Sequence, residues 1–203
     1  MKTAAKIHQQ QTTNNKQQTT MSSLTIQDLD KLQTTHPELP MELVRGEIIV
    51  MSPSGLESDE VAAEIVAQLR NWVRPRKLGR VIASSGGFRL PNADGDVRAP
   101  DASFILAEKL PRPTEEYASL VPDLMFEVKS KNDSLKKLRQ KIEEFIQLGT
   151  QVGVLVDPRT LTMEVYRPNG EKIVLGNEDV LEVPELLPGW QLFVADVWAP
   201  EFE

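Results

Sequence analysis

Residues 124–156 read LMFEVKSKNDSLKKLRQKIEEFIQLGTQVGVLV, and this stretch decides the fold. It opens with a mostly apolar run, 124–129, and closes with a fully apolar run, 152–156. Between them, large apolar residues recur every three or four positions, which predicts an amphipathic helix with Gly149 as its C-terminal cap. Strand, helix and strand in this order predict a right-handed βαβ unit. The two strands should therefore be parallel neighbours in one sheet.

Further elements are expected on both sides of this unit. Residues 42–51 alternate around Gly46 and predict a β-hairpin or a bent strand. A helix should begin at Ser58, a suitable N-cap, and end near Pro75. Shorter strands are expected at 81–84, 87–90, 101–107, 161–166, 172–175 and 192–194. The predicted class is α/β or α+β, with one mixed sheet flanked by two main helices and with additional β-hairpins.

Length and composition bound the domain organisation. The chain has 203 residues, and residues 1–22 are rich in Gln, Thr and Asn, so we expect a disordered polar tail followed by a single domain over residues 23–203. No run of about 18 apolar residues occurs, so we expect no membrane segment and a cytoplasmic protein.

The residue types that are missing exclude several kinds of site. The chain has no cysteine and two histidines, His8 and His36, both ahead of the main body. Thiolate metal sites and cysteine nucleophiles are therefore excluded, and sites built on histidine are disfavoured. Carboxylates, lysines, arginines, hydroxyls and a hard metal ion remain.

Charge is distributed unevenly along the chain. The formal net charge is -7, and removing the tail, which holds three lysines and no acid, leaves 20 basic and 30 acidic residues. Many of the basic residues fall into two clusters, Arg70–Arg80 and Lys129–Lys141. Each cluster is either a solvated helix face or a set of phosphate contacts.

Two of the predicted strands carry charge where burial is expected. Asp101 opens one strand, and Glu127 and Lys129 project from one face of another, because side chains alternate along a strand. Burying a carboxylate and an ammonium costs several kcal/mol, by a rough estimate, unless each is paired. Taken alone, the pair could belong to a cross-strand ion-pair ladder, and Asp101 could be a turn-capping residue.

The pattern Pro100-Asp101 … Glu127-x-Lys129 resembles the active-site signature of the PD-(D/E)XK nuclease superfamily, which has the restriction-endonuclease-like fold. A longer ordered set of motifs resembles the bacterial family of putative restriction endonucleases over roughly residues 24–197. These motifs are Glu42-Leu43-Val44-x-Gly46-Glu47, Met51-Ser52-Pro53-x-Gly55, Arg98-x-Pro100-Asp101, Glu127-Val128 and Val156-Asp157-Pro158.

This resemblance implies an Mg²⁺-dependent endonuclease that hydrolyses DNA phosphodiester bonds. Asp101, Glu127 and the backbone carbonyl of Val128 would hold Mg²⁺, or Mn²⁺ in its place. Lys129 would position and help to deprotonate the attacking water, or stabilise charge in the transition state. Glu42 would add a further carboxylate near the metal.

The resemblance also bears on partners and on competing functions. A homodimer is expected, since two-fold symmetry matches duplex DNA. Family members commonly carry a His where this chain has Ser58, a Tyr at Phe145 and an aromatic residue at Gly153. The alternative is therefore a weak or inactive nuclease-fold protein that serves as a DNA-binding or protein-binding regulatory module. Glu64 is a weaker catalytic candidate, and the candidate phosphate contacts are Arg98, Lys131, Lys136 and Arg74.

Overall fold

The computed structural model describes residues 23–51 and 53–202, so the predicted polar tail, 1–22, lies outside the described residues. Within the described ranges the chain forms three α-helices: α1 (Ile26–Thr35), α2 (Leu56–Arg76) and α3 (Leu135–Gln147). None of the described helices is long and apolar enough to cross a membrane.

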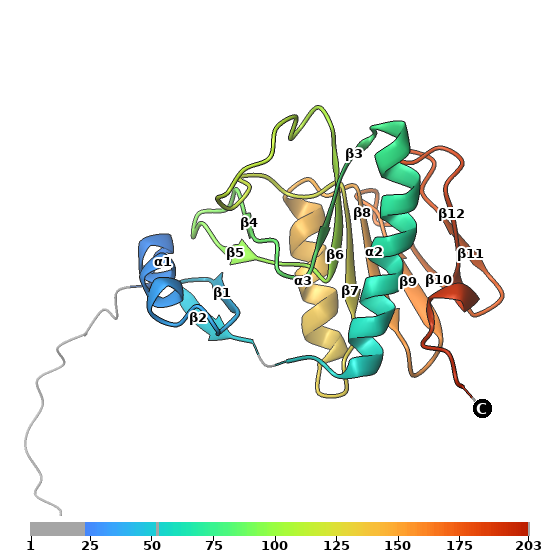
Figure 1. Ribbon diagram of the computed structural model, residues 1–203, viewed down its shortest axis with the longest axis horizontal. Coiled ribbons are helices and arrows are strands. Elements are labelled where there is room, and N and C mark those ends of the chain that lie inside the picture. Colours follow the sequence, from blue (N-terminus) through green and yellow to red (C-terminus); the bar gives the residue numbers. More distant parts are fainter. Residues whose placement is uncertain (1–22, 52, 203) are drawn as a thin grey trace, which may run out of the picture.

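A six-stranded mixed sheet forms the centre of the molecule (Figure 1). Its strand order is β10-β9-β8-β7-β6-β3. The strands are β3 (Gly79–Ala83), β6 (Ala102–Leu106), β7 (Leu124–Val128), β8 (Val152–Asp157), β9 (Thr162–Tyr166) and β10 (Lys172–Leu175). Strands β7 and β8 pair in parallel on either side of α3 in the sequence, which confirms the pairing predicted from residues 124–156. The mixed α+β class is confirmed as well.

The two long helices cover opposite faces of this sheet (Figure 1). Apolar residues of α2, among them Ile65 and Leu69, pack against Phe126 of β7. On the other face, Ile142 and Phe145 of α3 pack against the alternate residues of the strands. The alternation of side chains along each strand therefore divides the core into two layers.

A second sheet supports the amino-terminal side of the domain. Its strand order is β2-β1-β5-β4, and its strands are β1 (Met41–Val44), β2 (Glu47–Val50), β4 (Phe88–Arg89) and β5 (Val97–Arg98). The hairpin β1–β2 confirms the reading of residues 42–51. Its two turn residues, Arg45 and Gly46, both have positive φ, at 52° and 75°, as a tight hairpin turn requires. Leu43 pairs with Val97, and this register carries β1 toward the start of β6.

The carboxyl-terminal segment closes the layer that contains α2. Strands β11 (Val180–Glu182) and β12 (Gln191–Phe193) form a small antiparallel pair that is followed by a 3₁₀ turn, Val194–Val197. Leu187, Trp190 and Leu192 from this segment are buried in the same cluster as α2.

Helix α2 begins earlier than predicted from sequence and ends near Pro75, as predicted. It begins at Leu56 with Gly55 as N-cap, and the hydroxyl of Ser58 donates a hydrogen bond to the carbonyl oxygen of Gly55 at 2.9 Å. Leu56 is exposed and so gave no apolar signal. At the other end the helix continues past Pro75 to Arg76, and Lys77 closes it in the left-handed conformation with φ 55°.

Candidate active site

Asp101 and Glu127 lie next to each other at one end of the central sheet. Strands β6 and β7 are antiparallel with Ala102 opposite Phe126, so the residue before β6 stands opposite Glu127. The backbone N–H of Val128 donates a hydrogen bond to Asp101 Oδ2 at 2.7 Å, which fixes the orientation of this carboxylate. Burial raises the pKa of Asp101 above its usual value. The structure thus brings together the two carboxylates that the sequence motif predicts.

Glu127 is a buried acid on the sheet face that α3 covers. It is 3% exposed, and its Oε1 lies 2.7 Å from the Nζ of Lys141. This oxygen nevertheless makes no well-aligned hydrogen bond. Burial, reinforced by the neighbouring carboxylates Asp101 and Glu42, raises the pKa of Glu127 to about 8 against the attraction of Lys141.

Glu42 reaches the same end of the sheet from β1. It is 6% exposed, and its Oε1 accepts a hydrogen bond from the backbone N–H of Ala99 at 2.9 Å. Its Oε1 also lies 3.3 Å from Lys141 Nζ, and its Oε2 lies 3.5 Å from Arg98 Nε. Burial alone would raise the pKa of Glu42, but Lys141 and Arg98 outweigh that effect and hold the pKa below its usual value.

Lys141 on α3 is the residue that joins these carboxylates, and sequence reasoning missed it. It is 7% exposed, and its ammonium contacts Glu127, Glu42 and the carbonyl oxygen of Ala99, the last at 3.0 Å. The two acids raise the pKa of Lys141 despite its burial. Reading it as part of a solvated helix face was therefore wrong.

A signal for Lys141 was present in the sequence. It lies three residues after Leu138 and four before Phe145, which are apolar positions of α3, so helical periodicity places it on the face that packs against the sheet. A lysine at such a position needs a buried anionic partner.

Lys129, the lysine of the sequence motif, follows β7 directly but makes different contacts. Its backbone N–H donates to the carbonyl oxygen of Val156 at 2.8 Å, and its Nζ donates to the carbonyl oxygen of Ser130 at 3.0 Å. Among the described residues it forms no ion pair with Asp101 or Glu127, and the ammonium beside Glu127 belongs to Lys141.

The predicted phosphate contacts separate into three groups. The guanidinium of Arg98 is largely buried between Glu42 and Glu144, with Arg98 Nη1 2.9 Å from Glu144 Oε2. Lys131 and Lys136 are exposed and follow β7, at the same end of the sheet as Asp101. Arg74 lies in the last turn of α2, which leads to Gly79; Gly79 pairs with Leu106, at the end of β6 far from Asp101.

The weaker candidate and the positions that depart from the family pattern have structural partners. Glu64 accepts a hydrogen bond from Gln68 on its own helix. Phe145 is fully buried in the layer beneath α3. At Gly153 an added Cβ would lie 2.5 Å from Cγ2 of Ile142, so a side chain there would require Ile142 or α3 to shift.

The donor set fits a hard divalent cation held by two carboxylates. Glu127 Oε1 is buried without an aligned donor, and Asp101 Oδ2 is already oriented by Val128. In the described part of the chain, no group of three or more His, Cys, Asp or Glu side chains is placed to hold a metal by itself. A metal here would therefore take two carboxylates together with backbone oxygen and water, a coordination that suits Mg²⁺.

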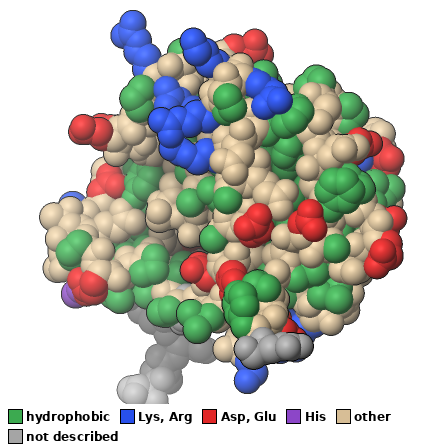
Figure 2. All heavy atoms as spheres, turned by 45° about the vertical axis from the view of Figure 1, so that its right-hand side comes forward, with side chains coloured by type: hydrophobic (Ala, Val, Ile, Leu, Met, Phe, Trp, Pro, Cys, Tyr) green, Lys and Arg blue, Asp and Glu red, His purple; other side chains and the backbone are tan. Residues whose placement is uncertain are grey.

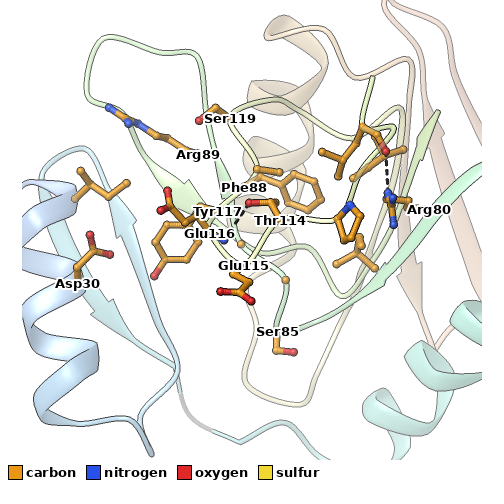
Figure 3. Close-up of a pocket in the computed structure, with 18 of the residues that line it drawn as sticks. Asp30, Arg80, Ser85, Phe88, Arg89, Thr114, Glu115, Glu116, Tyr117 and Ser119 are labelled. Atoms are coloured by element: carbon orange, nitrogen blue, oxygen red, sulfur yellow. Dashed lines mark hydrogen bonds between the residues drawn. The ribbon is translucent and has the colours of Figure 1, made fainter. Parts of the chain in front are cut away.

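A sizeable cavity is separate from these carboxylates. It has a volume of about 840 Å³ and lies between α1, the end of β3 and the loop 113–119. Asp30, Arg80, Glu115 and Tyr117 line it, and the carboxylates of the site do not (Figure 3).

Comparison with known proteins agrees with this geometry. The family model Uma2, described as "putative restriction endonuclease", matches residues 26–195. The chain belongs to the Uma2 family. A solved structure, described as a putative nuclease belonging to DUF820 from Anabaena variabilis, is similar with a TM-score of 0.72 and 26% sequence identity, over 86% of this chain and 97% of that one. A search of curated proteins found no match.

This Uma2 protein therefore has the restriction-endonuclease-like fold, which confirms the resemblance read from its motifs. The family and the similar structure support a nuclease-like function.

Proposed function

We propose that this Uma2 protein is an Mg²⁺-dependent endonuclease that hydrolyses phosphodiester bonds of DNA, with Mn²⁺ able to replace Mg²⁺. One observation carries the proposal: two carboxylates far apart in the sequence, Asp101 and Glu127, stand side by side at the end of a nuclease-type sheet. Burial and a backbone donor prepare them to hold a cation.

Each residue of the site has a chemical task in this proposal. Asp101 and Glu127 supply carboxylate oxygens for the metal, and the carbonyl oxygen of Val128 supplies another ligand. When bound, the metal polarises the scissile phosphate and lowers the pKa of a coordinated water. Lys129 holds the attacking water or stabilises charge on the phosphate in the transition state. Glu42 fixes the buried ammonium of Lys141 beside Glu127.

The surface charge supports DNA as the substrate in spite of the acidic composition. Lys131 and Lys136 are exposed beside the site. Figure 2 shows a second group of Lys and Arg side chains toward the upper part of the visible surface, above a region of carboxylates. Exposed cations of this kind contact the phosphate backbone without reading sequence. We expect two copies to act on the two strands of a duplex, in the cytoplasm.

The test is a cleavage assay on supercoiled plasmid, linear duplex and single-stranded DNA, with Mg²⁺, with Mn²⁺ and with EDTA. Glu127→Gln and Lys129→Ala should each reduce cleavage by at least about 100-fold, the scale of losing one preorganised catalytic group. Glu143→Gln is the matched control, because Glu143 is an exposed acid on α3. Equal cleavage by wild type and Glu127→Gln would show that the activity arises elsewhere.

One observation favours the alternative of a regulatory module. Lys141 already contacts two of the carboxylates, Glu42 and Glu127, so the fold does not depend on a metal to hold them together. No cleavage of any substrate, together with no Mn²⁺ binding by calorimetry, would favour that function over the nuclease.

A further inference from the structure

Lys141 and a divalent cation would compete for the same carboxylate oxygen of Glu127. The Nζ of Lys141 lies 2.7 Å from Glu127 Oε1, and the cation of the proposed function needs carboxylate oxygen from Glu127. A metal at that oxygen would stand only a few ångströms from the ammonium, and like charges at such a distance repel strongly in a buried site.

The other contacts of Lys141 offer its ammonium an alternative position, against Ala99 and Glu42. The carbonyl oxygen of Ala99 accepts its hydrogen bond at 3.0 Å, and Glu42 Oε1 lies 3.3 Å away. Glu42 is itself held by the backbone N–H of Ala99 and faces Arg98, so this side of the network stays in place when Glu127 changes partner.

We propose that Lys141 is a built-in competitor of the divalent cation: its ammonium occupies the Oε1 atom of Glu127 until a cation binds, and then withdraws to Glu42 and Ala99. This rests on the proposed function for the location of the cation. Lys141 therefore sets the metal affinity of the site below what its carboxylates alone would give, and it positions Glu127 rather than acting on the substrate.

The competition has a direct consequence for a variant that lacks the ammonium. Lys141→Met keeps most of the volume of the side chain but removes its charge. We expect this variant to bind Mn²⁺ at least about tenfold more tightly than wild type, because the cation no longer displaces an ion-pair partner. Lys141→Arg keeps the charge and should stay within about threefold of wild type. Lys31→Met, at an exposed lysine of α1, should leave the affinity unchanged.

Mn²⁺ binding to the full chain by titration calorimetry is the primary measurement, with Glu127→Gln locating the site. If wild type and Lys141→Met bind Mn²⁺ with equal affinity, and Glu127→Gln does not bind it, the proposed competition is wrong. The proposed nuclease function would be unaffected by that result. Absence of binding in both proteins would overturn the competition too. The proposed nuclease function is tested separately, and it is contradicted if DNA cleavage does not depend on Asp101 and Glu127.

A second measurement needs no folded variant at position 141. The side-chain Cε resonance of Lys141, followed by NMR in wild-type protein, should shift as Mg²⁺ saturates the site. A resonance that stays in place while Mg²⁺ binds would show that the ammonium does not move, and would overturn the proposal.

Discussion

The two faces of the central sheet have very different interiors. On the face covered by α2, Phe104, Phe126 and Val154 lie in a continuous apolar layer that the carboxyl-terminal segment closes. On the face covered by α3 the layer is apolar around Phe145, but at one end it gives way to Glu127 and Lys141. Adjacent residues of one strand therefore serve different ends, Phe126 stabilising the fold and Glu127 building the site.

This division has an energetic reason. Bringing a carboxylate and an ammonium out of water costs free energy that their mutual attraction only partly returns. The layer under α2 is built from apolar side chains and stabilises the sheet in proportion to the area that it buries. The stability contributed by the apolar face can thus offset the cost of the charge buried on the other face.

The largest effect that tests this comparison is expected from Phe126→Ala. Phe126 is fully buried under α2, and removing its ring should lower the free energy of unfolding by about 3–5 kcal/mol through lost transfer energy and a residual cavity. Urea unfolding measures the change. Glu127→Gln, one residue away, should cost far less, and a comparable loss at both positions would show that the faces are not divided as described.

A smaller effect is expected where α3 crosses β8. Gly153→Ala would place a Cβ 2.5 Å from Cγ2 of Ile142, so either the helix or that side chain must shift. Overpacking of this kind should lower the free energy of unfolding by about 1–3 kcal/mol in the same urea experiment. It should also reduce cleavage, because Lys141 precedes Ile142 on the displaced helix. Full stability in this variant would mean that the α3 face is loosely packed.

The sequence was sufficient for those parts of the fold that depend on local pattern. The strands and helix of residues 124–156 follow from periodicity, and the motif correctly paired Asp101 with Glu127. Helix α1 was missed because it is short and buries a single residue, Leu29, although Ile26, Leu29 and Leu32 recur at helical spacing. Local rules therefore recovered the elements that contribute most to the core.

Contacts between distant segments could not be derived in this way. Glu42 and Lys141 are 99 residues apart, and no local rule indicates that β1 meets α3. Arg98 was expected to contact phosphate, and the structure instead gives it Glu42 and Glu144, for the same reason. The motif pointed to Lys129 as the lysine of the site. The helical spacing of Lys141 was the better indication of which lysine is buried beside Glu127.

A pH experiment sharpens the comparison at Glu127. The unfolded chain releases this proton near pH 4.5, whereas burial raises the pKa in the folded chain to about 8. Between these values the folded state binds more protons, so this group lowers the free energy of unfolding as pH rises. Glu127→Gln cannot ionise. Its stability relative to wild type should therefore increase by roughly 3 kcal/mol from pH 5 to pH 8.

Urea unfolding of both proteins in EDTA, at several pH values, measures this difference. Asp101 and Glu42 titrate in both proteins, so much of their contribution cancels. A stability difference that does not change with pH would mean that Glu127 is ionised throughout and that Lys141 fully compensates it.

The smallest effect concerns the outer surface of α2, the helix of the apolar face. Arg74 is exposed in its last turn, at the end of the sheet opposite Asp101, and no carboxylate pairs with it among the described residues. If DNA extends to this end, Arg74→Ala should reduce the slope of log affinity against log salt concentration by about one, the release of one counterion. Fluorescence anisotropy with duplex DNA, in a Glu127→Gln background that does not cleave, measures this slope, and Lys31→Ala on α1 is the control. An unchanged slope would confine DNA to the α3 side and leave α2 with a purely structural role, which would make the division between the two faces complete.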